Sequence, residues 1–233
     1  MSILSLVKAI NRIGGLQLHV SSRTRLFLLV SVLLLPTSFL LAVSMQPWVD
    51  PKWMFLDTVT AAEFSDDCCH VYYGFVSNLG IFLWVGTAAV CLFCAMIVLQ
   101  WENVKDLLRF AITAGLFSAW LAMDDAFLLH EIVFPKIGVP QFLVLAVYVL
   151  LAISYIVASW RVIFSSEYWI LGLGVGAVAI SLGVDQFFHS LDSVIVIIED
   201  SAKFFGLFCW FAFHVVTLTV AFQTHTAHQK SLQ

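Results

Sequence analysis

Residues 142–160 read FLVLAVYVLLAISYIVASW, and no charged side chain interrupts this stretch. A helix needs about 20 apolar residues to cross the hydrocarbon core of a bilayer. Five other stretches are comparably apolar, and all six are continuous rather than alternating, so the sequence predicts an all-α bundle of about six membrane-spanning helices. The predicted spans are Leu26–Met45, Tyr72–Leu99, Leu107–Val133, Phe142–Val162, Tyr168–His189 and Val194–Phe222.

The composition of the whole chain supports this class. Of its 233 residues, 61% are hydrophobic and only 11% are charged. An ordinary soluble domain carries about 25% charged residues and could not bury this much apolar surface in one core. Disorder requires low hydrophobicity, and a disulfide-rich secreted module requires far more than 5 cysteines. A lipid bilayer is therefore the expected surrounding.

Lysine and arginine positions predict the orientation. With both termini in the cytoplasm, eight of the 11 basic residues fall inside, as the positive-inside rule favours. We therefore expect a bacterial inner-membrane protein with three regions. They are an amphipathic cytoplasmic segment at residues 1–22, a six-span membrane domain at residues 23–223 and a cytoplasmic tail at residues 224–233.

Polar residues gather at three places where the predicted spans meet the outer side. The third span ends with Asp124-Asp125 and His130-Glu131, the fifth ends with Asp185 and His189, and the sixth opens with Glu199-Asp200 and Lys203. Carboxylates inside a bilayer cost at least about 2.5 kcal/mol each, so they need partners or a purpose. We expect these three groups to meet in one vestibule.

Helical spacing predicts how these residues face. Asp124 and Glu131 are seven residues apart and would share a stripe, with His130 at the side of the helix. Asp185 and His189 are four apart and would point the same way. On the same helix, a face of small residues predicts close packing against a neighbouring helix. This face consists of Gly172, Gly176, Ala179 and Gly183.

The leading hypothesis for this vestibule is a metal-dependent hydrolase acting on a lipid or amphiphile. Histidine nitrogens with carboxylate oxygens suit zinc, iron or manganese, and a metal-bound water would be the nucleophile. The predicted ligands are His130, His189 and Asp185, and the predicted catalytic residues are Glu131, Glu199 and Asp125. The predicted supporting residues are Asp124, Lys203, Ser77 and Asn78.

Two other classes of function stay open. A stripe on the last span fits a proton- or cation-coupled transporter, and it consists of Glu199, Lys203, Gly206, Trp210, His214 and Thr217. A scaffold subunit would instead use Lys203 to neutralise nearby acids and so fix the helix packing. Cys68-Cys69 in the outer loop fit free thiols or partner-linked disulfides better than a metal site. No nucleic-acid or phosphate-binding motif is present in the sequence.

The order of several motifs resembles the alkaline ceramidase superfamily of membrane-embedded zinc amidases. The resemblance rests on Glu63, Ser77-Asn78, Ser118 with Asp124-Asp125, and Asp185. It implies zinc-dependent amide hydrolysis, although Ala122 stands in place of that family's metal-binding histidine, and Glu199 with Lys203 in place of its paired histidines.

Two further resemblances concern the segment from Glu199 to Lys203 and the chain as a whole. The segment from Glu199 to Lys203 is similar to the retinal-lysine segment of microbial rhodopsins, which would make Lys203 a Schiff-base lysine. The whole chain also resembles bacterial multi-pass membrane proteins with Asp-Asp…His-Glu and Glu-Asp…Lys segments, and this likeness implies no activity.

Overall fold

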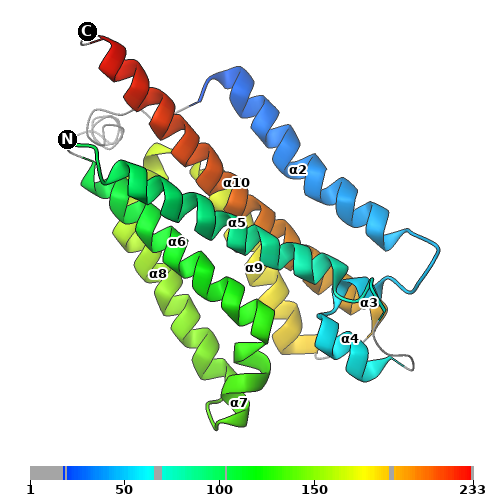
Figure 1. Cartoon of the computed structure of the whole chain (residues 1–233). Helices are drawn as coiled ribbons and strands as arrows, with labels where there is room; N and C mark the ends of the chain where they lie inside the picture. Colours follow the sequence, from blue (N-terminus) through cyan, green and yellow to red (C-terminus); the bar gives the residue numbers. More distant parts are fainter. Residues whose placement is uncertain (1–17, 19, 66–69, 103, 189–191, 232–233) are drawn as a thin grey trace. The chain divides into compact units, whose positions relative to one another are not determined.

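The structure is a computed structural model that describes residue 18 and residues 20–65, 70–102, 104–188 and 192–231. Within these ranges every regular element is a helix (Figure 1). The elements are α2 (Ser22–Ser44), α3 (Lys52–Phe55), α4 (Thr58–Phe64), α5 (Phe75–Val98), α6 (Lys105–Phe127), the π-helix η1 (Leu129–Val133), α7 (Phe134–Lys136), α8 (Gln141–Ser165), α9 (Tyr168–Phe188) and α10 (Ser193–Ser231).

Six of these helices are long and apolar enough to cross a membrane: α2, α5, α6, α8, α9 and α10. The predicted all-α class and the predicted number of six spans are therefore confirmed. Large apolar side chains point outward along these helices, as Leu34, Phe82 and Val157 illustrate with exposed fractions of 61%, 67% and 66%. Such a surface suits lipid rather than water and indicates a membrane protein.

The two predicted terminal regions have different outcomes. The amphipathic segment at residues 1–22 lies almost entirely outside the described residues, as do Cys68 and Cys69. At the other end, α10 continues through most of the predicted tail and ends at Ser231.

The prediction of one continuous helix from Leu107 to Val133 is wrong. Helix α6 ends at Phe127, and Leu128 adopts the left-handed conformation with φ 50° and ψ 45°. A left-handed residue ends a right-handed helix, so the chain turns there before η1 begins. Glycine and asparagine usually occupy such positions, and a leucine gives no signal of the break.

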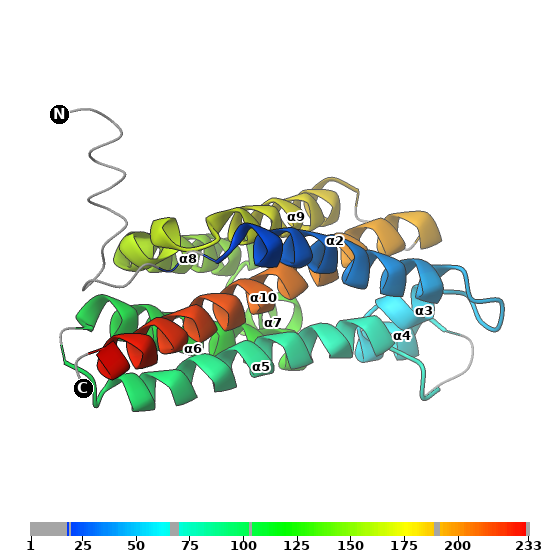
Figure 2. The same ribbon diagram turned by 90° about the horizontal axis from the view of Figure 1, so that it is seen from above.

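The described chain divides into two compact units, of which the first contains residues 84–168 and 213–231. Within this unit α6 and α8 lie side by side and run in opposite directions, because Asp124 contacts Tyr148 and Thr113 contacts Ser159 (Figures 1 and 2). The core of the unit includes the fully buried Phe110.

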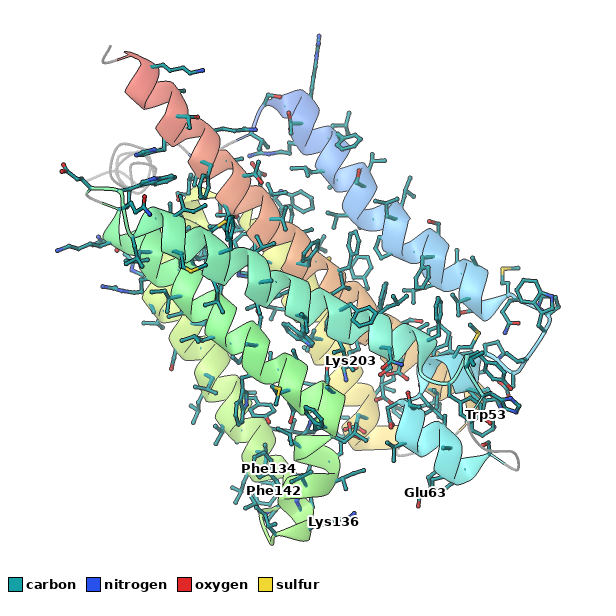
Figure 3. All side chains as sticks on the ribbon, in the orientation of Figure 1. Trp53, Glu63, Phe134, Lys136, Phe142 and Lys203 are labelled. Carbon is teal, nitrogen blue, oxygen red and sulfur yellow. The ribbon has the colours of Figure 1, made fainter. Side chains whose placement is uncertain are left out.

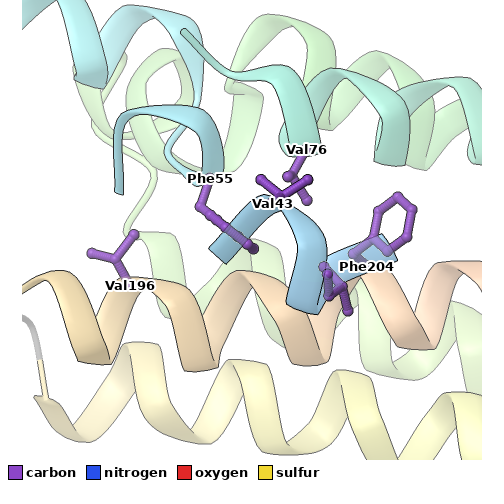
Figure 4. Packing of buried hydrophobic residues seen from close by; sticks show 6 residues of the cluster. Val43, Phe55, Val76, Val196 and Phe204 are labelled. Carbon is purple, nitrogen blue, oxygen red and sulfur yellow. The ribbon is translucent and has the colours of Figure 1, made fainter. Parts of the chain in front are cut away.

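The second unit contains residues 22–83 and 169–212. Its apolar core forms where α2, α3, the start of α5 and the start of α10 converge, as Figure 4 shows. The buried members of this cluster are Leu40, Val43, Phe55, Val76, Val196 and Phe204. Phe55 is completely buried, so the short helix α3 is anchored by its apolar side chain.

Helices α9 and α10 approach each other closely in the second unit, at Gly174 and Gly206. A Cβ added at Gly206 would lie 2.9 Å from the Gly174 carbonyl oxygen and 2.6 Å from Val178 Cγ2. The prediction that the face with Gly172, Gly176 and Gly183 packs closely is therefore wrong, because no heavy atom of another described helix lies within 4 Å of a Cβ built at any of the three positions. The packing face of α9 is the neighbouring one, which contains Gly174.

Candidate functional site

The site is built around Asp124, in the last turn of α6. This carboxylate is only 2% exposed, and it accepts three hydrogen bonds. Oδ1 accepts from the His130 backbone N–H at 3.0 Å and from the Tyr148 hydroxyl at 2.7 Å, and Oδ2 lies 2.5 Å from His130 Nδ1. Asp124 therefore joins α6, η1 and α8 at one end of the first unit.

The break at Leu128 explains why His130 reaches Asp124. The left-handed turn redirects the chain, so that the backbone and the ring of His130 both fold back onto the end of α6. The prediction that Asp124 and Glu131 share one helical stripe, with His130 at the side, is therefore wrong, since the helix breaks at Leu128 and His130 is the direct partner of Asp124. Helix η1 is a π-helix, a geometry that recurs at functional sites.

His130 lies between two carboxylates. Its Nδ1 contacts Asp124, and its Nε2 lies 3.3 Å from Glu131 Oε1. Burial of the ring by itself lowers the pKa of His130, but hydrogen bonds to Asp124 and Glu131 and the attraction of both carboxylates outweigh burial and raise this pKa from 6.5 to about 9. His130 is therefore cationic at neutral pH, with both ring nitrogens protonated.

The neighbouring Asp125 points to a different helix. The indole N–H of Trp84 in α5 donates a hydrogen bond of 3.0 Å to Asp125 Oδ2. Asp124 and Asp125 thus tie α6 to two different helices of the same unit, α8 and α5. The adjacent pair of acids, which looked alike in the sequence, has two distinct roles in packing.

A second polar pair lies deeper in the same unit. Tyr155 Oη and His214 Nε2 are 2.8 Å apart, and the two residues are 3% and 0% exposed. The ring of Phe110 stacks on His214 with centroids 5.3 Å apart and an angle of 17°. Tyr155 is about 21 Å from the start of α8 and about 15 Å from its end at 1.5 Å per residue, so the pair lies near mid-span.

Two further polar contacts join α8 to α6. Thr113 Oγ1 lies 3.3 Å from Ser159 Oγ, and Arg161 Nη1 lies 3.3 Å from Asp106 Oδ2. We call the α6–α8 interface with its polar side chains and His214 the polar seam. It consists of Asp106, Thr113, Asp124, Tyr148, Tyr155, Ser159, Arg161 and His214.

Comparison with protein families gives one match. Residues 24–217 match the family described as Domain of unknown function (DUF8692). The chain belongs to this family. No curated protein and no solved structure matches the chain.

The remaining predicted residues of this DUF8692 chain lie in the second unit or outside the described ranges. Asp185, Glu199 and Lys203 are half-buried on α9 and α10, each has an interaction partner, and Figure 3 labels Lys203. His189 lies outside the described residues. Because His130 and Asp185 belong to different units, the predicted common vestibule stays a prediction.

Two other predicted residues of the second unit have identifiable surroundings. Asn78 donates a hydrogen bond of 3.4 Å from Nδ2 to Thr58 Oγ1, and this bond ties α5 to α4. Ser77, its neighbour on α5, is half-buried. Glu63, which contributed to the ceramidase resemblance, is exposed on α4 (Figure 3).

The predicted metal centre is also not established. Among the residues that the structure describes, no group of three or more His, Cys, Asp or Glu is placed to hold a metal ion. Metal binding at His130 would in addition require loss of a proton, because a ligating imidazole is neutral. The ligand set of His130, His189 and Asp185 and the hydrolase that depends on it stay predictions.

Sequence reasoning missed three partners, namely Trp84, Tyr148 and Tyr155. All three stand in apolar runs, where aromatic residues usually pack against lipid or other helices. The available signal was the spacing of Tyr148, Tyr155 and Ser159 on one face of α8, at seven and then four residues.

Proposed function

We propose that the protein is a membrane transporter of protons and that protons cross its first unit along the polar seam. The observation that carries this proposal is the buried Tyr155–His214 pair near mid-span. An ionisable residue at this depth is costly, and in membrane proteins it usually marks an ion or proton pathway.

The chemistry of the pair suits proton transfer. Histidine is the side chain that exchanges protons most readily near neutral pH, and a tyrosine hydroxyl both donates and accepts hydrogen bonds. The bond between Tyr155 and His214 therefore links two groups that pass a proton without leaving the apolar interior. Stacking of Phe110 fixes the plane of the imidazole.

The spacing along α8 supports a continuous route. Tyr148 and Tyr155 are two helical turns apart, about 10 Å, and Ser159 follows one turn later, about 6 Å further. Several water molecules between Tyr148 and Tyr155, and fewer between Tyr155 and Ser159, would complete a chain of hydrogen bonds. The route includes the contact of Ser159 with Thr113.

Each end of the seam carries an acid with access to the surroundings. At one end, the side chain of Glu131 is 41% exposed and contacts His130. The pKa of His130 is raised to about 9, so His130 carries a proton at neutral pH. At the other end, the side chain of Asp106 is 28% exposed and contacts Arg161. The protonated His130 next to the exposed Glu131 suits proton uptake. Asp106, at the opposite end of the seam, would release the proton.

The distribution of Lys and Arg favours a bacterial inner membrane with both termini cytoplasmic. Glu131 and His130 would then face the outer side, and Asp106 the cytoplasm. Reporter fusions after Ser231 and in the turn at Lys136, which Figure 3 labels, test this orientation. We expect cytoplasmic activity at Ser231 and outer activity at Lys136, and the reverse pattern would contradict it.

Proton flux into liposomes tests the proposed function. Purified protein is reconstituted with an internal pH-sensitive dye, and a membrane potential drives proton entry. His214→Gln keeps a hydrogen-bonding group for Tyr155 but cannot exchange a proton, so we expect flux to fall at least about tenfold. His225→Gln is the matched control, because His225 lies on the same helix and stacks on Trp101 outside the seam.

The scaffold alternative gives a different result. If the seam only fixes helix packing, the wild-type protein conducts no protons. His214→Gln then lowers thermal stability and has no effect on flux. Proton entry into liposomes with the wild-type protein that is no faster than entry into empty liposomes would therefore contradict the transporter proposal.

A further inference from the structure

One hydroxyl beside the Tyr155–His214 pair is buried without a partner. Thr217 is 1% exposed, and its Oγ1 has no hydrogen-bond partner among the residues that the structure describes. Buried polar groups are normally paired, so a single orphaned hydroxyl needs an explanation. Bound water is the usual partner of such groups in protein interiors.

The orientation of Thr217 differs from that of four other hydroxyl residues in the long helices. Thr224 and Thr226 of the same helix donate to the carbonyl oxygens four residues earlier, at 2.8 Å and 3.1 Å. Ser154 and Thr113 do the same on α8 and α6, both at 2.8 Å. This internal bond is the easiest way to satisfy a hydroxyl in a membrane helix, and Thr217 does not use it.

The position of Thr217 identifies what lies near it. Residues three apart on a helix are neighbours with Cβ atoms about 5–6 Å apart, so Thr217 lies beside His214 on α10. A water molecule bound to the Thr217 hydroxyl would therefore lie close to the imidazole of His214. The Tyr155 hydroxyl, which contacts His214, is a group that both donates and accepts hydrogen bonds.

We infer that Thr217 holds a buried water molecule next to the Tyr155–His214 pair. The role of this water rests on the proposed function: it takes the proton from the pair and passes it toward the end of the seam that carries Asp106. In the transfer, one O–H bond of the water forms as the N–H or O–H bond of the donor breaks, and the water releases a different proton onward. No oxidant or other reactant is required.

Tight burial around Thr217 favours water over a larger solute as the occupant. The neighbours of Thr217 on α10, Phe213, His214 and Leu218, are 0%, 0% and 1% exposed. A closely packed interior of this kind has few voids larger than a water molecule, and a buried water makes two to four hydrogen bonds.

Two measurements test the inference separately from the proposed function. The first is a structure of the full-length protein in lipid nanodiscs at a resolution that reveals ordered water. We expect a density peak at hydrogen-bond distance from Thr217 Oγ1. A hydroxyl turned onto the Phe213 carbonyl, with no peak beside it, would overturn the inference whatever the flux.

The second measurement is proton flux in liposomes with Thr217→Val and Thr217→Ser. Valine has the shape of threonine without the hydroxyl, so we expect flux at least about tenfold below wild type, the factor that one lost hydrogen bond produces. Serine keeps the hydroxyl and should keep most of the flux. Thr226→Val is the matched control, because the Thr226 hydroxyl bonds to its own helix.

The outcomes separate the two proposals. Ordered water in the structure together with no flux in wild type would overturn the transporter and leave the water site standing. Normal flux in Thr217→Val, with wild-type flux present, would remove the water from the path. A thermal midpoint that rises in Thr217→Val would also count against bound water, because removing a truly orphaned hydroxyl stabilises a protein.

Discussion

The ring nitrogen Nδ1 of His130 lies 2.5 Å from Oδ2 of Asp124. On a continuous α-helix, residues six positions apart would point about 120° away from each other. The left-handed conformation of Leu128 brings them together and gives the buried carboxylate a cationic partner. This contact defines one end of the polar seam.

Asp124→Asn tests that contact. The amide keeps the shape of the carboxylate but removes its charge, so the pKa of His130 should fall back toward 6.5. We expect the free energy of unfolding to fall by on the order of 2 kcal/mol, because one partner of a buried ion pair is lost. Unfolding in detergent measures this change. Asp50→Asn is the control: its pair with Lys52 is partly exposed, and it should cost less than about 1 kcal/mol.

The pH dependence of stability follows from His130. Its pKa is about 9 in the folded protein against 6.5 as the ordinary value, so protonation favours the folded state. The contribution is complete below about pH 6.5, decreases as the pH rises and is lost above about pH 9. Unfolding free energies at about pH 6 and about pH 10 should differ by on the order of 2 kcal/mol more in wild type than in His130→Gln. An equal difference in both proteins would show that His130 is not the titrating group.

Glycine-to-alanine substitutions test the α9–α10 contact. Gly206→Ala places a methyl group 2.6 Å from Val178 Cγ2 and 2.9 Å from the Gly174 carbonyl, so it should destabilise the protein by about 1–3 kcal/mol. Gly172→Ala and Gly176→Ala meet no heavy atom of another described helix and should raise stability by up to about 1 kcal/mol through helix propensity. Thermal unfolding of the three variants measures both effects. Destabilisation by Gly172→Ala would contradict the assigned packing face.

Trp84→Phe tests the link between α5 and α6. Phenylalanine keeps most of the apolar contact but removes the N–H that donates to Asp125. We expect a loss of about 1–3 kcal/mol in unfolding free energy, since the carboxylate loses a hydrogen bond in a partly buried position. Trp48→Phe is the control, because Trp48 is 83% exposed. Similar losses in the two variants would mean that the indole N–H adds nothing.

The sequence predicts the six membrane helices well because each is a long apolar run. It does not predict the end of α6, because Leu128 has no preference for the left-handed region and the apolar run continues through it. It also misassigns the packing face of α9. Periodicity identifies Gly172 and Gly176 as one face, but it does not show that the partner helix lies against Gly174.

The candidate site was predictable in part. Asp124, Asp125, His130 and Glu131 stand out as polar residues at the end of an apolar run, and the structure places them in one unit. Their partners Trp84, Tyr148 and Tyr155 do not stand out, since an aromatic side chain in an apolar helix has the same appearance whether it packs or donates a hydrogen bond. His214 was part of a predicted stripe, and its bond to Tyr155 needed the fold.

The central claim is that Tyr155 and His214 pass protons as one unit, and proton flux in a double-mutant cycle tests it most directly. Wild type, Tyr155→Phe, His214→Gln and the double variant are compared in liposomes under the same membrane potential. Residues that act as a unit give non-additive losses. We therefore predict that His214→Gln lowers flux at least about tenfold and that adding Tyr155→Phe lowers it no further. Four equal rates would contradict the account.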